Sequence, residues 1–218
     1  MNEFEQIEES IKKIPRGKIF FPEYFYKKYP PENIKKVLAR LARNGEIKFI
    51  ARGMYVRPKK SHYLKGRVLM PNSYEIVKAI SKKTGEVISM YGPAAANYVG
   101  LSTQIQMRAI YYTTGRSRYV IVNGKKDIKL VHINPKKLVM PGTIVCLVVT
   151  ALWYQGKNLL TPLAVKKIHH RLDSEEYCEV IKNLDKMPLW MKCVFEQYQD
   201  MQPDDPQLRE DSNSYYQG

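Results

Sequence analysis

Cysteine is scarce in this 218-residue sequence, and long hydrophobic runs are missing. The most apolar stretch, Thr143 to Trp153, is about half of the roughly 20 residues that a membrane-spanning helix needs. The first residues, MNEFEQIEESIKK, are acidic and amphipathic, unlike a secretory signal. The three cysteines, Cys146, Cys178 and Cys193, form no CxxC pair, which is typical of free thiols in a reducing compartment. We therefore expect a cytoplasmic protein with no membrane partner.

The motifs of several enzyme classes are missing as well. The sequence has no GxxxxGK[ST] phosphate-binding loop, no HExxH zinc motif and no GxSxG nucleophile turn. Acidic residues are rare between positions 69 and 170, where only Glu75, Glu86 and Asp127 occur. A metal-dependent nuclease needs at least two oxygen ligands for Mg²⁺, and the segment DIK at Asp127 to Lys129 has no identifiable carboxylate partner. We expect no catalytic residues and no cofactor.

The four histidines are scattered and do not indicate a metal site. His62 and His132 are isolated, whereas His169 and His170 are adjacent. Neighbouring residues on a helix point in different directions, so their rings are not expected to share a metal. We expect no metal in this protein.

Positive charge is what the sequence has in abundance. It contains 36 Lys and Arg against 21 Asp and Glu, for a formal net charge of +15. Residues 1–68 carry 17 basic and 7 acidic side chains, residues 69–170 carry 14 and 3, and residues 171–218 carry 5 and 11. A basic body with an acidic end indicates a polyanionic partner. Nucleic acid is the commonest such partner, and an anionic membrane surface is the alternative.

The first 60 residues predict three helices followed by a hairpin. Apolar residues at helical spacing predict a helix over residues 4–14, and Pro22 begins a brief second helix. A third helix, residues 31–43, has a stripe at i, i+3, i+4 and i+7: Ile34, Val37, Leu38 and Leu41. EIKFIA and MYVRP, separated by the turn Arg52-Gly53, predict two antiparallel strands. This order is that of a winged helix-turn-helix domain.

Such a domain places its third helix in the major groove of DNA and its hairpin along the backbone or minor groove. The expected DNA-binding residues lie outside the apolar stripe or on the hairpin: Asn33, Lys35, Lys36, Arg40, Arg43, Lys48, Arg52 and Arg57. We expect Arg40 to contact base edges and Arg52 to contact the backbone or minor groove. The alternative is a solvated basic face without a ligand.

The remaining chain predicts a second domain of the α+β class. Residues 61–72 are a basic linker, residues 73–200 form the domain, and residues 201–218 are an acidic tail without an apolar stripe that we expect to be disordered. Helices are expected over YEIVKAISKKTG and GPAAANYVG, with a strand, EVISM, between them. Three further strands follow, the last two joined by a type I′ turn at Asn123-Gly124. The chain then becomes helical, so the domain combines a small antiparallel sheet with a helical C-terminal part.

A second group of basic residues surrounds these strands. Its members are Arg108, Arg116, Arg118, Lys125, Lys126 and Lys129, followed by Lys136 and Lys137. They alternate with Tyr111, Tyr112 and Tyr119, and basic residues beside exposed aromatic rings suit single-stranded or structured RNA. Because side chains alternate along a strand, half of the tyrosines are instead expected to point into a core. An RNA-binding surface, an extension of the DNA footprint and ordinary core packing all remain open.

The order of motifs resembles the antitoxins of the AbiE abortive-infection type, which belong to type IV toxin–antitoxin systems. The resemblance covers roughly residues 5 to 200 and is carried by VLARLARNGEIKFIARGMYVRP, YGPAAANYVGLSTQIQMRAIYYTTG, the lysine-bearing hairpin and ALWYQGK. It implies an N-terminal DNA-binding domain and a C-terminal antitoxin domain. It also implies repression of the protein's own operon and neutralisation of a nucleotidyltransferase-like toxin without a stable complex.

These observations predict a non-enzymatic transcriptional regulator that binds double-stranded DNA at its own promoter and serves as an antitoxin. An RNA-binding module that uses the basic second domain is the alternative. A third possibility is a protein that binds its toxin directly, for which the acidic tail is the only candidate surface.

Overall fold

The computed structural model describes residues 2–60 and 68–201 and has an α+β fold of helices and small antiparallel sheets. The chain forms two compact units, residues 1–86 with 118–130 and residues 87–117 with 131–218. This grouping differs from the expected boundary at residues 61–72, because the helix after that boundary and the second hairpin join the N-terminal unit. A folding boundary at that linker stays a prediction. Residues 61–67 of the expected linker and residues 202–218 of the expected tail lie outside the described residues.

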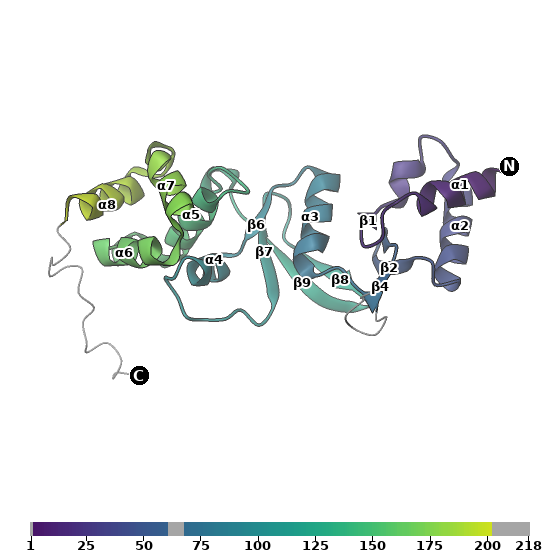
Figure 1. Ribbon diagram of the computed structural model, residues 1–218, viewed down its shortest axis with the longest axis horizontal. Coiled ribbons are helices and arrows are strands. Elements are labelled where there is room, and N and C mark those ends of the chain that lie inside the picture. The colour runs from purple at the N-terminus through teal and green to yellow at the C-terminus, as the bar shows by residue number, and fades with distance from the viewer. Residues whose placement is uncertain (1, 61–67, 202–218) are drawn as a thin grey trace. The chain divides into compact units, whose positions relative to one another are not determined.

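The first unit opens with two α-helices that lie side by side in Figure 1. Helix α1 (Glu3–Lys12) begins with a capping box between Asn2 and Glu5, and α2 (Pro31–Arg43) ends before Gly45, whose φ is 75°. Between them lie strand β1 (Ile19–Phe20) and a short 3₁₀ helix, η1 (Pro22–Phe25). The expected brief second helix is therefore one 3₁₀ turn.

Strand β2 (Lys48–Ala51) and strand β3 (Met54–Val56) form the predicted hairpin, and Gly53 in its turn has a φ of 70°. Strand β1 pairs with β3, so the sheet has the order β1-β3-β2. The pairing of Ile19 and Phe20 with β3 was not predicted. The core between helices and sheet contains the apolar stripe of α2 and, in addition, Ile7, Ile11, Phe20 and Ile47. Each such side chain contributes about 1.5 to 3 kcal/mol when it is fully buried.

The first unit continues beyond the hairpin. Strands β4 (Lys59–Lys60) and β5 (Val68–Leu69) pair with each other, and α3 (Ser73–Thr84) ends at Gly85 in the left-handed conformation. Strand β8 (Arg118–Val122) and most of β9 (Lys125–His132) form a second hairpin. Asn123 and Gly124 have φ values of 49° and 80°, as a type I′ turn requires. This hairpin buries Val120, Val122, Ile128 and Leu130.

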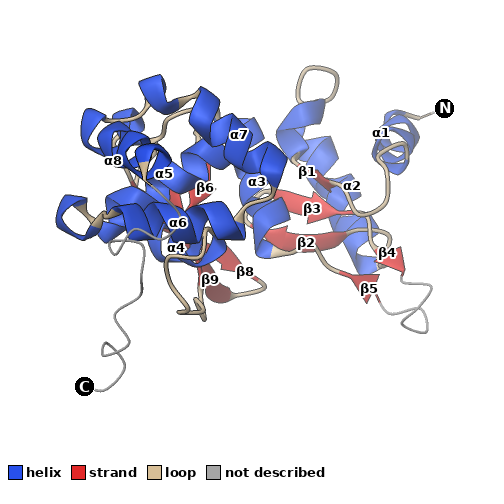
Figure 2. Ribbon diagram, turned by 60° about the vertical axis from the view of Figure 1, so that its left-hand side comes forward, coloured by secondary structure: helices blue, strands red, loops and turns tan. Residues whose placement is uncertain are grey.

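The second unit contains strand β6 (Ile88–Met90), strand β7 (Ala109–Thr113) and the end of β9. Strands β6 and β7 are antiparallel, and directly after β9 the Ile133 N–H donates to the Thr113 carbonyl at 2.9 Å. Its helices, blue in Figure 2, are α4 (Gly92–Tyr98), α5 (Ile144–Gln155), α6 (Pro162–Arg171), α7 (Ser174–Lys182) and α8 (Leu189–Asp200). The described residues of this unit also form the 3₁₀ helices η2 (Pro135–Lys137), η3 (Lys157–Leu159) and η4 (Leu184–Lys186).

Helix α5 is the centre of the second unit. It is apolar on nearly every side, and eight of its twelve residues are buried, as expected of a helix surrounded by others. Helix α4 approaches it closely at Gly92, where an added Cβ would lie 2.7 Å from the Cβ of Tyr154. Only glycine fits at this contact. No helix in the described part of the chain is long and apolar enough to cross a membrane.

Candidate nucleic-acid interface

The outer face of α2 carries two basic side chains directly opposite its buried stripe. At about 100° per residue, Lys36, Ala39 and Arg43 share one face of the helix. Both Lys36 and Arg43 are exposed, and neither has a hydrogen-bond or ion-pair partner within residues 2–60 and 68–201. Two cations about two turns apart on an open helix face can contact successive phosphates or base edges of a polyanion.

One flank of α2 faces α1 instead of open solvent. Arg40 Nη2 lies 2.5 Å from Glu8 Oε2 on α1, and Asn33 Nδ2 donates to Glu3 Oε1 at 3.2 Å. On the other flank, the Nζ of Lys35 lies 2.8 Å from Glu32 of the same helix. These three expected DNA-binding residues therefore already have acidic or acceptor partners within the protein.

Glu8 is the electrostatic centre of the contact between α1 and α2. Its carboxylate accepts from Lys12 Nζ at 2.5 Å as well as from Arg40. The hydrogen bond from Lys12 is the main reason that the pKa of Glu8 lies below its usual value, and the charges of Lys12 and Arg40 add to it. The carboxylate thus stays charged at neutral pH and neutralises part of the cationic surface beside it.

The hairpin residues separate into two groups. Lys48 on β2 and Arg52 in the turn are exposed and lack a polar partner in the part of the chain that the structure describes. The guanidinium of Arg57, by contrast, donates to the carbonyl oxygens of Lys12 and Ile14 at the end of α1. Those carbonyls have no helical donor of their own, so Arg57 completes the hydrogen bonding of the helix end.

One aromatic residue of this hairpin is not among the expected DNA-binding residues. Phe49 lies on β2 with half of its side chain exposed, and its ring meets that of Tyr55 edge-on at 5.7 Å. An exposed ring between Lys48 and the turn is an apolar contact point beside two cations. The apolar and polar residues of EIKFIA alternate only loosely, so the pattern did not indicate that Phe49 is exposed. The irregularity corresponds to a register shift between Phe49 and Ala51.

The second hairpin presents a face on which one tyrosine and one isoleucine lie opposite two lysines. Tyr119 is paired with Lys129 across the strands, and Ile121 is paired with Lys126. The Nζ atoms of Lys126 and Lys129 lie 5.4 and 5.9 Å from the centre of the Tyr119 ring, within cation–π range. Tyr119 is 50% exposed and Ile121 is 51% exposed. Of the expected tyrosines, this one lies on the surface, whereas Tyr111 and Tyr112 are partly buried.

The other members of the expected second basic surface do not gather in one place. Arg118 is held by Glu86, with Nη2 2.7 Å from Oε2, and Lys125 is exposed beside the hairpin turn. Both belong to the first unit together with Lys126 and Lys129, whereas Arg108 and Arg116 are exposed residues of the second unit. The compact unit of the N-terminal hairpin thus contains four members of the group, and the second unit contains Arg108, Arg116, Lys136 and Lys137.

Two of the three carboxylates considered for a nuclease have structural partners. Glu75 accepts from the backbone N–H of Asn72 in the capping box of α3, and Glu86 pairs with Arg118. Asp127 is the extra residue at an irregularity in the pairing of β8 with β9. Within residues 2–60 and 68–201, the structure contains no group of three or more His, Cys, Asp or Glu side chains that could hold a metal ion.

The two adjacent histidines lie on α6 beside α7 and α8. The rings of His169 and His170 are 6.1 Å apart with planes inclined by 25°. His169 also stacks on Tyr177 at 4.0 Å, and its Nδ1 lies 3.0 Å from the Tyr198 hydroxyl. These contacts hold helices α6, α7 and α8 together.

Comparison with known proteins identifies a family. Residues 6–180 match DUF6088, a family of unknown function, and the chain belongs to this family. No curated protein and no solved structure matches the chain.

Proposed function

We propose that the first unit contains a winged helix-turn-helix that binds duplex DNA. In this proposal α2 enters the major groove and the β2–β3 hairpin contacts the backbone or minor groove. The order α1, β1, η1, α2, β2, β3 supports it, because it provides two helical segments, a helix of groove-binding size and a hairpin wing. The observation that carries the proposal is the open face of α2, where Lys36 and Arg43 lie opposite the buried stripe.

The contacts with α1 change the role proposed for each residue. Lys36 and Arg43 become the main proposed DNA contacts of the groove helix. Lys48 and Arg52 become the main proposed DNA contacts of the wing. Arg40 and Asn33 border α1 and contribute only if the duplex competes with Glu8 and Glu3 for them. Arg57 supports the fold because its donors are already used.

We further propose that the protein is a cytoplasmic regulator of its own operon and the antitoxin of a type IV toxin–antitoxin pair. The support is the resemblance of its motif order to AbiE-type antitoxins, which spans both units. In this proposal the partner toxin is nucleotidyltransferase-like and is neutralised without a lasting complex. Co-expression of the full chain with the product of the adjacent gene tests this. Restored growth is the expected result, and continued toxicity would remove the antitoxin assignment.

DNA binding is tested by fluorescence anisotropy with a labelled duplex from upstream of the gene and with a random duplex. Specific regulators bind with dissociation constants of about 10⁻⁸ to 10⁻¹¹ M at physiological salt. If about five to seven phosphates are contacted, log K should fall against log salt with a slope of roughly −4.5 to −6. Equal affinity for both duplexes would contradict a sequence-specific regulator.

Two variants of α2 are matched by a control with the same change of charge. Lys36→Ala and Arg43→Ala should each weaken promoter binding by about 1 to 3 kcal/mol if they contact bases. Lys182→Ala, on an exposed position of α7, should leave binding unchanged. If all three variants bind alike, α2 is not the groove helix.

The exposed face of the second hairpin favours a second candidate function, RNA binding. Tyr119 between Lys126 and Lys129 offers a ring for base stacking with two cations beside it. Stacking on an aromatic side chain contributes about 1 to 3 kcal/mol per base. Under this candidate, Tyr119→Ala would weaken binding of a single-stranded oligoribonucleotide strongly and leave duplex binding unchanged. Unaltered affinity for the oligoribonucleotide would exclude it.

A further inference from the structure

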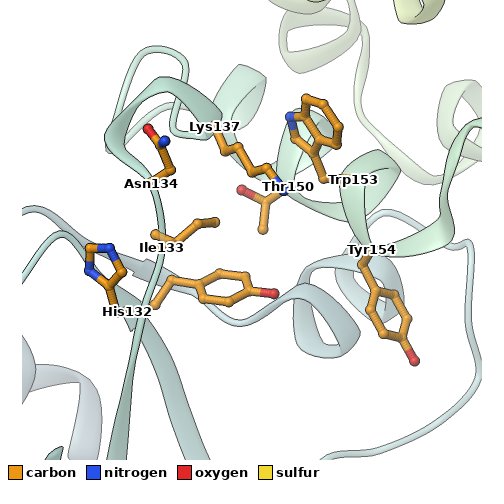
Figure 3. A pocket seen from close by; sticks show the side chains of 8 residues that line it. His132, Ile133, Asn134, Lys137, Thr150, Trp153 and Tyr154 are labelled. Carbon is orange, nitrogen blue, oxygen red and sulfur yellow. The ribbon is translucent and has the colours of Figure 1, made fainter. Parts of the chain in front are cut away.

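A pocket of about 270 Å³ lies in the second unit, between the segment after β9 and helix α5. His132 and Asn134 line one side, Thr150 and Trp153 of α5 line the other, and Lys137 of η2 lies between (Figure 3). No role in the proposed DNA or RNA binding uses this pocket.

Two polar atoms of α5 are buried at the pocket without a hydrogen-bond partner among the described residues. They are the Thr150 hydroxyl, in a residue only 1% exposed, and the indole Nε1 of Trp153. The nearby Cys146 thiol is at best a weak partner for the hydroxyl, because thiols donate and accept hydrogen bonds poorly. Leaving a donor unpaired in the interior is unfavourable, so both atoms favour a ligand that accepts hydrogen bonds.

The charge in the lining has one sign. Lys137 is the only charged side chain of the eight that form the pocket, and no carboxylate is among them. Its Nζ lies 4.7 Å from the centre of the Trp153 ring. Asn134, the N-cap residue of η2, also lines the pocket (Figure 3). The ammonium, the indole N–H and the Thr150 hydroxyl thus offer three donors for a group of negative charge.

Other side chains of the pocket are apolar or already have hydrogen-bond partners. His132 is tied to the backbone, with its Nδ1 2.8 Å from the carbonyl oxygen of Gly115. The Tyr112 hydroxyl bonds to the backbone at Gly92, and burial raises its pKa, so it stays uncharged. The ring of Trp153 and the side chain of Ile133 provide apolar surface. A ligand therefore needs an organic body as well as an acidic group.

We propose that this pocket binds a small organic oxyanion, whose carboxylate or phosphate oxygens accept from Lys137, Trp153 and Thr150. Its volume lies just below the range of about 300 to 1,000 Å³ that holds drug-sized ligands. The ligand is accordingly the size of a pentose phosphate or an aromatic carboxylate. The site gives the protein a small-molecule ligand in addition to its nucleic-acid partner, and it stands independently of the DNA proposal.

Isothermal titration calorimetry of the full chain with ribose 5-phosphate, benzoate and inorganic phosphate tests the site. At least one of the two organic probes should bind with one-to-one stoichiometry and more tightly than inorganic phosphate, because only they fill the apolar part. Binding of ribose 5-phosphate but not benzoate indicates a phosphate ligand. Binding of benzoate but not ribose 5-phosphate indicates a carboxylate ligand. If neither organic probe binds, or neither exceeds inorganic phosphate, the proposal is overturned.

Three variants connect binding to the named donors. Lys137→Gln should weaken the bound probe by about 10- to 100-fold, and Thr150→Val, which keeps the side-chain shape, by about fivefold. Lys136→Gln removes one positive charge from a neighbouring residue outside the pocket. This variant should bind the probe as tightly as the wild type does.

Thermal unfolding with and without probe checks that the variants are folded. The probe should raise the Tm of the wild type and of Lys136→Gln, and raise it less in Lys137→Gln and Thr150→Val. Equal binding by Lys137→Gln and Lys136→Gln would overturn the assignment.

Discussion

The backbone N–H of Asn123 donates a hydrogen bond to the carbonyl oxygen of Ile50 at 3.0 Å. It joins the tip of the β8–β9 hairpin to strand β2, more than 70 residues away in the chain. The lysines of the second hairpin belong to the same compact unit as the first hairpin. If that unit binds a nucleic acid, both hairpins can contribute to one surface.

This contact predicts that one amide at the hairpin tip is protected from hydrogen exchange with solvent. The amide hydrogens of a type I′ turn normally exchange quickly, because solvent reaches them. We expect the Asn123 amide to exchange at least tenfold more slowly than that of Gly124, as measured by NMR hydrogen exchange. Exchange of both amides at the same fast rate would mean that the hairpin tip is not bound to β2.

Two arginines of the first hairpin should respond differently to the same substitution. Arg57→Ala leaves the carbonyls of Lys12 and Ile14 without their donor and should lower the free energy of unfolding by about 1 to 3 kcal/mol. Arg52→Ala removes an exposed side chain and should change it by less than about 0.5 kcal/mol. Urea unfolding measures both. Equal losses would contradict the distinction between a structural and a surface arginine.

Replacing Glu8 should strengthen DNA binding if α2 is the groove helix. Glu8→Gln removes the carboxylate that pairs with Lys12 and Arg40, so Arg40 becomes available to phosphates, whereas Lys12 keeps Glu46 as a partner at 3.4 Å. We expect affinity to rise by up to about fivefold and the salt slope to become steeper by about one. Glu9→Gln is the matched control, because Glu9 lies on the same helix with its side chain exposed. A rise of the same size in both variants would show a general charge effect only.

The cluster around His169 predicts a pH dependence of stability. Burial, with a smaller contribution from His170, lowers the pKa of His169 below its usual value of 6.5. The unfolded chain therefore binds a proton at this site more readily than the folded chain. The resulting stabilisation is present above about pH 6.5 and is lost as the pH falls through the lowered folded pKa.

Urea unfolding at pH 7.5 and 5.5 measures this effect. The free energy of unfolding should be smaller at the lower pH, and the difference should shrink in His169→Gln. That variant also loses the stacking on Tyr177, so its stability at pH 7.5 serves as its own reference. An unchanged pH difference in the variant would rule out His169 as its source.

Elements whose side chains repeat with a clear period could be predicted from the order of residues alone. The stripe Ile34, Val37, Leu38 and Leu41 marked α2, and all four residues are buried. The turn residues Asn123 and Gly124 marked the second hairpin, since only a few residue types adopt positive φ at both positions. The α+β class followed from these local signals, because burial of one face is required wherever such a helix or strand packs.

Which of these elements contact one another depends on how the chain packs in three dimensions. Strand β1 has two residues, too few for any periodic pattern, and it exists because β3 supplies its hydrogen bonds. The same holds for the basic residues, which look equivalent in the sequence. Arg40 is neutralised by Glu8 on α1 and Arg57 is bound to the end of α1, whereas Lys36 and Arg43 stay open. The physical reason is that a charge is engaged or available according to neighbours distant in sequence, and local spacing carries no information about them.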